Sequence, residues 1–395
     1  MVAAMLKEPL RVAIVGGGIG GAAAAAALTQ RGIAVRLFEQ APALAEVGAG
    51  VALQPNGIRM LRQLGLAAAL TRCGARWLDP QFRRSDGSFI AHMWPPERGA
   101  EIEFYGMHRA DLLNLFVEQL PANVVATEHK CVGFEQDEAQ AIISFANGRR
   151  EVADVVIAAD GIHSRLQEFV VAPSAPLPSG SVAYRGLIPS ASVAWRRGAM
   201  RNWLGAGKHF LVYPVRADEL INYVGFVRTD EQTRESWSAA GDPAALAQAF
   251  AGWDPMVEAI TAAASTTFRW GLYDREPLPA WTRGRLTLLG DAAHPMLPHV
   301  GQGANQAIED AVTVATVLAR ADRGSAVQAL RIYESLRRPR TARVQLSARV
   351  NGARYDGASR DLGVRDQQLA AQSQERAWIW NYDAGSEAAA AATAL

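Results

Sequence analysis

A glycine-rich turn between a short apolar strand and an alanine-rich helix constrains the fold of this chain more than any other feature. Residues 11–15 (RVAIV) predict a buried strand, and the residues after the turn, up to Gln30, predict a helix. Between them Gly16, Gly18 and Gly21 have the G-x-G-x-x-G spacing. Such glycines allow a tight turn, the approach of a pyrophosphate and close helix–strand packing. The pattern predicts a Rossmann-like dinucleotide-binding domain.

An acidic residue follows at the distance expected for a ribose ligand. The strand predicted from Ile33 to Phe38 ends at Glu39, 18 residues beyond Gly21 (39 minus 21). In dinucleotide-binding units an acidic residue about 20 residues on binds a ribose hydroxyl. The alternative is an ordinary glycine turn with Glu39 facing solvent. The uncharged run from Val12 to Leu28 contains this strand, turn and helix, which argues against a targeting signal or membrane span.

Composition sets limits on size and partners. A chain of 395 residues allows two or three domains at about 150 residues each, and 49% hydrophobic residues can build a large core. The formal net charge of +1 and the lack of like-charge blocks predict no nucleic-acid or membrane partner. Cys73 and Cys131 offer neither a disulfide framework nor metal-ligand spacing, so we expect inert thiols, no metal and a cytoplasmic location.

Patterning along the chain predicts a nucleotide domain interrupted by an antiparallel one. Val47 to Asn56 predicts a loop, and helices are expected at Ile58 to Leu70, His108 to about Leu120, Gly303 to Leu318 and Tyr333 to Val350. Strands are expected at Ala141 to Phe145, Asp154 to Ala159 and Arg285 to Leu289, with antiparallel strands at Val182 to Ile188, His209 to Val215 and Tyr223 to Val227. Glu387 to Leu395 predicts a fraying helical tail.

Two further motifs complete a set of three. ADGIHSR at Ala159 to Arg165 closes a buried strand, and LGDAAHPMLP at Leu289 to Pro298 closes another. Each alone could be a simple turn or cap. In this order after GGGIGG they resemble the motif set of proteins that bind one FAD, and we expect His294 to shape the loop. The glycines of Pro298 to Asn305 (PHVGQGAN) expose backbone N–H groups before a helix, which can stabilise negative charge on a reduced flavin near N1 and C2. The alternative is a flexible surface loop.

The three motifs resemble those of the class A FAD-dependent aromatic hydroxylases, the group of para-hydroxybenzoate and salicylate hydroxylases, over about Leu10 to Asp383. The resemblance implies an α/β fold: a Rossmann-like FAD-binding domain of the GR2 type, as in para-hydroxybenzoate hydroxylase, with an inserted antiparallel β-sheet substrate domain and a C-terminal helix. We place the FAD-binding domain at 1–180, with a substrate-contacting segment near 75–108, the substrate domain at 181–275, and the return of the FAD-binding domain with the C-terminal helices at 276–395.

The resemblance also implies the cofactor chemistry. NADH or NADPH reduces FAD, O2 adds at flavin C4a, and the hydroperoxide hydroxylates a small hydroxylated aromatic or pyridine carboxylate. Glu39 resembles the ribose ligand, Arg109 a residue near the phosphates and Asp291 the ribityl ligand. Gln167 stands where the family usually has an arginine, so Arg165 is the candidate to replace it at the nicotinamide cofactor. The cofactor-binding residues implied are Gly16, Gly18, Gly21, Glu39, Gln40, Gly50, Val51, Arg109, Asp160, Asp291, Pro298, Gly301, Gly303, Ala304 and Asn305.

Substrate contacts are expected in the inserted domain. The segment KHFLVYPVR resembles the pocket-lining segment of the salicylate, 3-hydroxybenzoate and 6-hydroxynicotinate hydroxylases, and its His209 and Tyr213, four apart on a strand, share one face. A phenol, with a pKa of about 10, needs a proton acceptor near neutral pH. The catalytic candidates are His209, Tyr213 and His299, and the substrate-binding candidates are Tyr105, Arg185, His209, Tyr213, Pro298 and His299. The alternatives are a half-buried strand and an Arg185 that pairs within the protein.

Other flavoprotein activities use the same scaffold. An FAD-dependent oxidase or dehydrogenase and a low-turnover flavin-binding sensor are the alternatives. The chain has one strand-associated G-x-G-x-x-G, which matches hydroxylases whose reductant docks transiently. The expectation is a monomeric or homodimeric hydroxylase of a small aromatic substrate that uses FAD, O2 and NADH in preference to NADPH.

Overall fold

The FAD-binding half of the chain is built on a mostly parallel sheet. The computed structural model describes residues 10–44, 49–99, 101–229, 239–356 and 362–395. Six strands lie in the order β19-β20-β12-β1-β2-β8, parallel except for β19 against β20. Their bounds are β1 Arg11–Val15, β2 Ala34–Phe38, β8 Val125–Ala126, β12 Val155–Ala158, β19 Thr282–Arg283 and β20 Leu286–Leu288. Three chain segments far apart in sequence therefore meet in one sheet.

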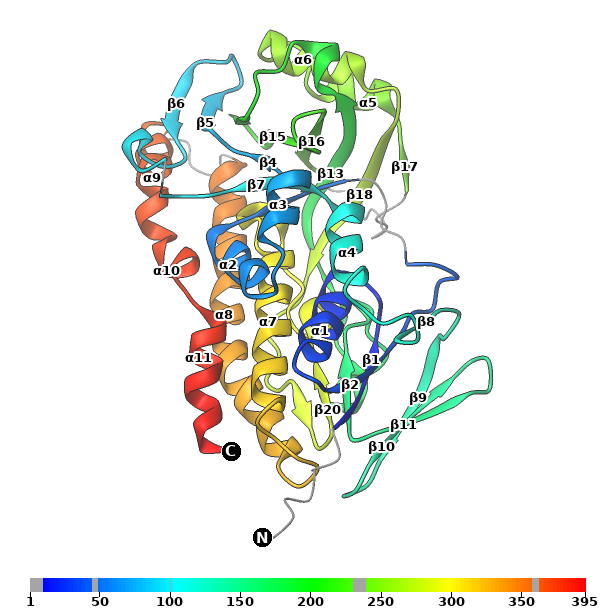
Figure 1. The fold of residues 1–395 in the computed structure, drawn as a ribbon. Coiled ribbons are helices and arrows are strands. Elements are labelled where there is room, and N and C mark those ends of the chain that lie inside the picture. Colours follow the sequence, from blue (N-terminus) through cyan, green and yellow to red (C-terminus); the bar gives the residue numbers. More distant parts are fainter. Residues whose placement is uncertain (1–9, 45–48, 100, 230–238, 357–361) are drawn as a thin grey trace.

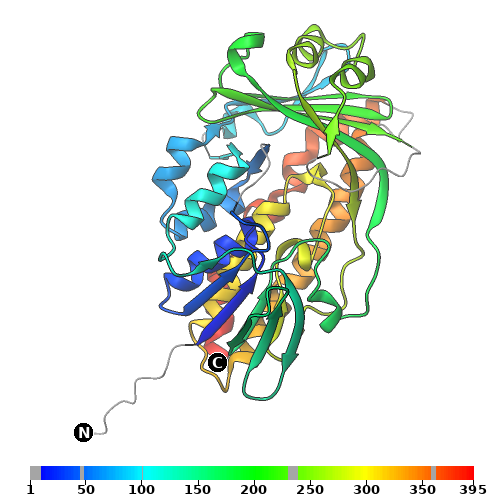
Figure 2. The ribbon, with the colours of Figure 1, turned by 90° about the vertical axis from the view of Figure 1, so that its right-hand side faces the viewer.

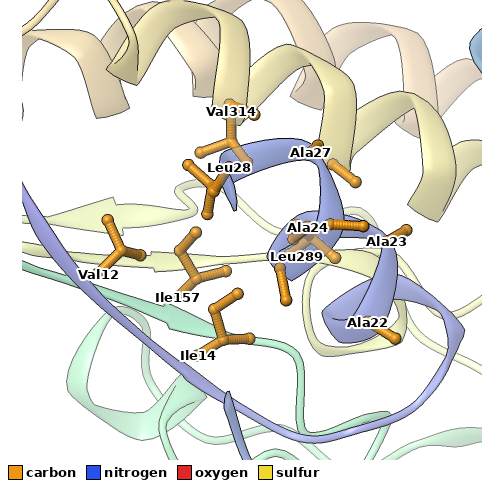
Figure 3. Close-up of a cluster of buried hydrophobic side chains, with 14 of the residues drawn as sticks. Val12, Ile14, Ala22, Ala23, Ala24, Ala27, Leu28, Ile157, Leu289 and Val314 are labelled. Carbon is orange, nitrogen blue, oxygen red and sulfur yellow. The ribbon is translucent and has the colours of Figure 1, made fainter. Parts of the chain in front are cut away.

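Alanine side chains let two helices pack closely on this sheet. The first is α1 (Ile19–Thr29), whose residues from Ala22 to Leu28 are fully buried, and the second is α7 (Gly303–Leu318). Figure 3 shows alanines of α1 facing Val314 of α7 and Ile14 of β1. A methyl group on Gly20 would lie 2.8 Å from Leu289 and 3.3 Å from Ala307, so no larger residue fits there without a shift. This contact fixes the start of both helices over the sheet.

The remaining elements of this half surround the two helices. A three-stranded sheet of β11 (Arg150–Ala153), β10 (Ala141–Phe145) and β9 (Cys131–Gln136) lies at the lower right in Figure 1. A second small sheet contains β3 (Gly50–Leu53), β7 (Tyr105–His108) and β4 (Ala75–Arg76). The other helices are α2 Pro55–Gln63, α3 Ala67–Cys73, α4 Arg109–Val117, α8 Ala326–Tyr355, α9 Leu362–Glu375, α10 Ala377–Trp380 and α11 Ala384–Ala391.

An eight-stranded sheet forms the other half, and we call it the substrate sheet. Its order is β17-β18-β13-β16-β15-β14-β5-β6, antiparallel except for β14 beside β5. The strands are β5 Asp79–Arg84, β6 Phe89–His92, β13 Leu177–Pro189, β14 Ala199–Gly205, β15 Lys208–Val215, β16 Leu220–Arg228, β17 Ala240–Gly241 and β18 Thr267–Asp274. Helices α5 (Pro243–Ala249) and α6 (Pro255–Ala263) cover one face, as Figure 1 shows at the top, and Figure 2 shows the FAD-binding half below the other face.

The α/β class with an inserted antiparallel sheet is confirmed, and several boundaries differ from expectation. The loop predicted at 47–56 contains strand β3 and the start of α2, because residues 50–53 pair with β7; Val47 and Gly48 lie outside the described residues. The helix predicted at 58–70 is two helices, α2 and α3, separated where Gly65 takes a φ of +75°. Helix α4 ends at Val117, before the expected Leu120.

The C-terminal helices are longer and better packed than the sequence suggested. Helix α8 extends over 30 residues around an internal Pro339. Helix α11 is no fraying tail: Ala384 and Ala388 are fully buried against the core of the FAD-binding half. Its alanines are a packing surface, which composition alone could not distinguish from a frayed end.

The expectations about thiols, metals and membranes concern absences. Cys73 and Cys131 are free and half-buried, and burial raises the pKa of Cys131 to about 11. Among the residues described, no group of three or more His, Cys, Asp or Glu side chains has a metal-binding arrangement. Within the same ranges, no helix combines the length and the apolar character needed to cross a bilayer.

Candidate active site

The glycine turn has room for a ligand at one position and none at two others. A Cβ on Gly16, whose φ is +106°, would lie 2.3 Å from the carbonyl oxygen of Ala159. A Cβ on Gly21 would lie 1.9 Å from the carbonyl oxygen of Gly16. A Cβ on Gly18, the residue that caps α1, meets no atom within 4 Å. The turn is therefore closed toward the protein and open at the helix N-terminus, which fits a pyrophosphate.

Glu39 lies at the carboxyl end of β2, directly beside this turn. Its Oε2 accepts a hydrogen bond of 2.8 Å from the backbone N–H of Gly17, and its Oε1 accepts one of 2.8 Å from Ala41. Both bonds hold the carboxylate next to the open face of the turn. Gln40 follows it and is exposed. This position fits the expected ribose contact.

The Asp-Gly motif and the Gly-Asp motif are joined by Gln167. Its buried side chain donates a 2.8 Å hydrogen bond from Nε2 to the carbonyl oxygen of Ala292. Asp160 accepts a 2.9 Å bond from the N–H of Arg165, and burial raises the pKa of its carboxyl group. The residue that departs from the family pattern thus connects the two motifs, whereas the side chain of Arg165 is exposed.

The Gly-Asp motif is anchored to α7 by a buried histidine. Gly290, with a φ of +62°, begins a short 3-10 turn that exposes Asp291. His294 Nε2 lies 2.6 Å from Oδ2 of Asp310, both side chains are fully buried, and the N–H of Gly290 donates to the same oxygen at 3.1 Å. The interpretation of His294 as a loop-shaping residue agrees with this geometry. The anchor leaves Asp291 at the surface of the loop, where a ribityl chain could reach it.

A second helix N-terminus opens beside the loop of residues 298–302. Gly301 takes a φ of +63°, and its carbonyl and that of Val300 accept bonds of 3.0 and 2.7 Å from Gln54 Nε2. A Cβ on Gly303, the first residue of α7, would meet no atom within 4 Å. The start of α7 therefore has open space beside Gly303, where a group that develops negative charge could lie close to the helix N-terminus.

Asn305 does not share this exposure. Asn305 is fully buried; its Oδ1 accepts a 2.9 Å bond from the N–H of Gln54, and its Nδ2 donates at 2.9 Å to Ala52. It connects α7 to β3 and the start of α2. Ala304 is half-buried against the core. Their cofactor contacts remain predictions, while Gln54 emerges as a support that the sequence did not single out.

The small sheet of β3 and β7 brings the FAD-binding half against the substrate sheet. A Cβ on Gly106 would lie 1.9 Å from the carbonyl oxygen of Pro214, and the N–H of Gly50 donates a 2.7 Å bond to Oδ1 of Asn222. Val51 alternates to the other face and is buried. Arg109 begins α4 directly after β7, with its N–H bonded to Ala49 at 2.8 Å. Gly106 thus allows the main chains of the two halves to touch, and Gly50 allows the main chain of β3 to approach the side chains of Tyr213 and Asn222.

His209 and Tyr213 lie on the predicted common face of β15, the face turned toward the FAD-binding half. Between them, Phe210 and Val212 point to the opposite face, into the core under α5 and α6. Four residues of strand separate the pair by about 13 Å. Tyr213 is buried against Gly50, Gly106 and Trp77, whose ring centroid is 5.4 Å away. Burial raises the pKa of Tyr213, and the charges of Arg185 and Arg109 oppose that shift.

His299 joins His209 at the other end of the face. Their ring centroids are 5.4 Å apart, and the His299 side chain is 7% exposed. Burial, with a smaller effect of His209, lowers the pKa of His299 to about 3, so this ring is neutral at neutral pH. Its Nδ1 is buried without a hydrogen-bond partner in the described structure. Pro298 precedes it and is exposed.

Two other substrate candidates have different environments. Tyr105 faces away from the substrate sheet into the core of the FAD-binding half, next to Gly74, so the structure does not bring it to the other candidates. Arg185 of β13 is buried with its guanidinium 4.4 Å from the ring centre of Trp270. The alternation of β13 places Arg185 on the same face as Ala183, which packs toward the loop of residues 297–300.

Several residues of this region escaped the sequence analysis. Asn222 carried a usable signal, because it is the one polar residue inside the apolar run of β16. Its Nδ2 is buried without a partner in the structure described. Gly106, Trp77 and Asp356 gave no signal, since only the meeting of distant segments assigns them a role.

Comparison with known proteins identifies this arrangement. A family model described as an FAD binding domain matches residues 9–348. The chain belongs to this FAD-binding family. It is 38% identical over 383 residues to a 3-amino-4-hydroxybenzoate 2-monooxygenase of Streptomyces platensis, covering 95% of this chain and 96% of that protein. It is 35% identical to a salicylate hydroxylase of Pseudomonas putida, with 98% and 96% coverage. A salicylate hydroxylase substrate complex superposes with a TM-score of 0.84 at 29% identity, covering 97% and 98% of the two chains.

These findings confirm the resemblance to class A flavin hydroxylases. The protein is an FAD-dependent aromatic hydroxylase that uses NAD(P)H and O2. The open glycine turn, the position of Glu39 and the open start of α7 fit an FAD along this edge of the parallel strands. The roles of individual residues at that cofactor and at the substrate remain predictions.

Proposed function

We propose that the protein hydroxylates a small benzoate or pyridine carboxylate that carries a ring hydroxyl, bound between the inner face of the substrate sheet and the start of α7. The observation that carries this proposal is the single face shared by Arg185, Tyr213 and His209, opposite His299 and the open N-terminus of α7. The face offers a buried cation, a phenol and an imidazole to a ring with acid groups. Relatives named for 3-amino-4-hydroxybenzoate and salicylate support the same class.

Arg185 is our candidate for holding the substrate carboxylate. Its guanidinium is 4% exposed and stacks on Trp270, so the group is fixed and largely desolvated. A carboxylate in such surroundings gains a charge-assisted, bidentate interaction. Burial raises the pKa of the Tyr213 phenol, and the charge of Arg185, on the same face of the sheet, opposes that shift.

The bound FAD supplies the oxygen-transfer chemistry, and this chain's residues bind, orient and protect the reactants. The tight contact of Gly50 and Gly106 with the substrate sheet excludes water along one side of the ring. The N–H groups at the start of α7 stabilise negative charge. His209 receives and returns the proton of the substrate hydroxyl, because an ionised ring hydroxyl makes the ring more electron-rich. Tyr213, whose phenol stays protonated, donates a hydrogen bond to the substrate.

The reductant, assembly and location are the finer parts of the proposal. We propose NADH as the preferred reductant, a monomer or homodimer as the active form, and the cytoplasm as its location. The half-buried, free Cys73 and Cys131 are compatible with a reducing compartment. We propose no nucleic-acid or membrane partner for a chain with a formal net charge of +1.

The first experiment measures NADH oxidation, peroxide and hydroxylated product with a panel of ring carboxylates. The panel contains 3-amino-4-hydroxybenzoate, salicylate, 3- and 4-hydroxybenzoate and 6-hydroxynicotinate, each with NADH and with NADPH. We expect one compound to accelerate NADH oxidation and give product with little peroxide. Acceleration that returns only peroxide identifies a substrate mimic. No acceleration by any ring carboxylate, with FAD bound, contradicts the proposal and favours an oxidase or sensor.

The carboxylate contact predicts a selective defect in an Arg185→Met variant. Loss of a buried charge-assisted pair should weaken binding of the active carboxylate at least about 10-fold. Binding of the corresponding phenol without a carboxylate should change little, because it never used the guanidinium. Both affinities can be measured from the flavin absorbance change on titration. Equal losses for the two ligands would assign Arg185 a packing role instead.

A further inference from the structure

A carboxylate from the far end of the chain is paired with the histidine of the proposed site. Asp356 caps the C-terminus of α8, and its Oδ1 lies 2.9 Å from Nδ1 of His209. His209 is 1% exposed and Asp356 is 9% exposed. Neither residue's sequence neighbourhood suggested the pair, since 147 positions separate them. Such a hydrogen bond determines which ring nitrogen carries the proton.

The surroundings hold the imidazole in one orientation. The ring stacks on Phe226, with centroids 4.2 Å apart and planes at 15°, and Tyr355 contacts it edge-on at 5.3 Å. The main chain before β15 is also held in place, because the N–H of Gly207 donates a 2.9 Å hydrogen bond to the carbonyl oxygen of Asp356. Both the side chain and the backbone of Asp356 therefore fix the start of β15.

The charged and titratable groups around Asp356 come from four elements. They are His209 on β15, His299 from the loop before α7, Arg228 at the end of β16 and the neighbouring Tyr355 of α8; the hydroxyl of Ser181 on β13 lies 3.5 Å away. Burial alone would raise the pKa of Asp356, but the hydrogen bond from His209 and the positive groups outweigh it and lower that pKa. The carboxyl group is thus ionised at neutral pH, and the nearby His299 is neutral.

We propose that Asp356 is a positioning residue for His209 in hydroxylation. Its carboxylate accepts a hydrogen bond from Nδ1–H of His209. The lone pair on Nε2 of His209 is then free to accept the proton of the substrate's ring hydroxyl. In that step the O–H bond breaks, an N–H bond forms on Nε2, and the positive charge gained by the ring is balanced by the carboxylate. The proton returns to water when product leaves. This assignment rests on the proposed function, because it needs a substrate with an ionisable hydroxyl.

The tautomer of His209 tests the pairing without any substrate. In the FAD-loaded protein labelled with ¹⁵N-histidine, long-range ¹H–¹⁵N spectra identify the protonated ring nitrogen of each of the seven histidines, and the signal missing in His209→Gln assigns this one. We expect Nδ1–H in the wild type and a change to Nε2–H, or a mixture, in Asp356→Ala. Asp356→Val, which also lacks an oxygen acceptor, serves as a second variant should the alanine variant fold poorly. An unchanged tautomer in a folded variant overturns the proposal.

Turnover measurements distinguish a positioning role of Asp356 from a purely structural one. With the substrate found in the panel, Asp356→Asn should lower kcat at least about 10-fold, part of the about 10²–10⁴-fold that a positioned acid–base group contributes, while KM and FAD binding change little. The acid limb of its pH profile should move to lower pH, because the carboxylate no longer stabilises the protonated ring. Asp254→Asn is the matched control: this carboxylate bonds Trp203 at 2.7 Å in the same domain, with no contact to His209.

The outcomes of the two experiments distinguish the two proposals. A lower melting temperature in Asp356→Asn with wild-type kcat and an unshifted pH profile assigns Asp356 a structural role and overturns the inference. A panel without any substrate contradicts the proposed function, yet the tautomer measurement still decides whether Asp356 controls His209.

Discussion

Substitutions of single glycines in the first turn distinguish effects on folding from effects on cofactor binding. Gly18 has a φ of −70°, which alanine adopts freely, and its missing side chain faces open space. We expect Gly18→Ala to leave the thermal stability of the FAD-free protein unchanged and to weaken FAD binding at least about 10-fold, or about 1.4 kcal/mol, because the methyl group occupies the space of the pyrophosphate. Quenching of FAD fluorescence during titration of apoprotein measures the affinity.

Gly21→Ala is the matched comparison within the same turn. Its methyl group would lie 1.9 Å from the carbonyl oxygen of Gly16, a main-chain atom that cannot move aside cheaply. Overpacking of this kind costs about 1–3 kcal/mol of folding stability. The FAD-free protein should therefore unfold at lower temperature in this variant but not in Gly18→Ala. Equal FAD affinity in Gly18→Ala and the wild type would show that the open face is not the pyrophosphate site.

At the scale of elements, α7 and α8 are joined by a buried ion network. Arg337 donates to Asp310 at 2.7 Å and to Glu309 at 2.5 Å, and Arg340 donates to Glu309 at 2.8 Å. Burial alone would raise the pKa values of Glu309 and Asp310, but both pKa values are lowered. The pKa of Glu309 is lowered mainly by Arg337 and Arg340, and that of Asp310 by His294 and Arg337. Since Asp310 also forms a hydrogen bond with His294, this network holds the loop of the Gly-Asp motif against α7.

We expect Arg337→Met to destabilise the protein by about 3–5 kcal/mol. The substitution leaves two fully buried carboxylates with fewer cations, and removal of one partner of a buried pair costs about that much. Denaturant unfolding of the FAD-free protein measures the change. The neighbouring Arg338→Met is the control, because Arg338 is half-exposed and its contact with Glu334 is a surface pair of 3.4 Å. Similar losses in both variants would contradict a special role for the buried network.

Elements that carry a motif were predictable, and elements defined by their partners were not. The sequence located β1, α1 and the start of α7, because glycine spacing and apolar period act within one segment. Strand β3 has four residues and exists through its pairing with β7, so local pattern suggested a loop. The same limit applies to the site: one-face spacing found His209 and Tyr213, whereas Asp356 and Gly106 acquire roles only from segments more than 100 positions away.

At the scale of the whole molecule, the two halves meet where glycine replaces a side chain. Gly106 of β7 lies against the main chain of β15, and its added Cβ would be 1.9 Å from the carbonyl oxygen of Pro214 and 2.8 Å from the ring of Tyr213. Neither half can relieve this contact by rotating a flexible side chain. A residue larger than glycine must therefore move the substrate sheet away from the FAD-binding half, or distort one of the two strands.

This geometry predicts that Gly106→Ala uncouples NADH oxidation from hydroxylation. Separation of the halves should admit water to the site and misplace the substrate ring, while the glycine turn proposed for FAD binding lies between β1 and α1, outside this contact. We expect the FAD affinity to stay within about 3-fold of the wild-type affinity, on the scale where 10-fold corresponds to about 1.4 kcal/mol. A larger share of the consumed NADH should be recovered as hydrogen peroxide. Gly133→Ala, whose Cβ would make an ordinary 3.6 Å contact with Ser144, should remain fully coupled. Tight coupling in Gly106→Ala would mean that the closeness of the two halves does not protect the reaction.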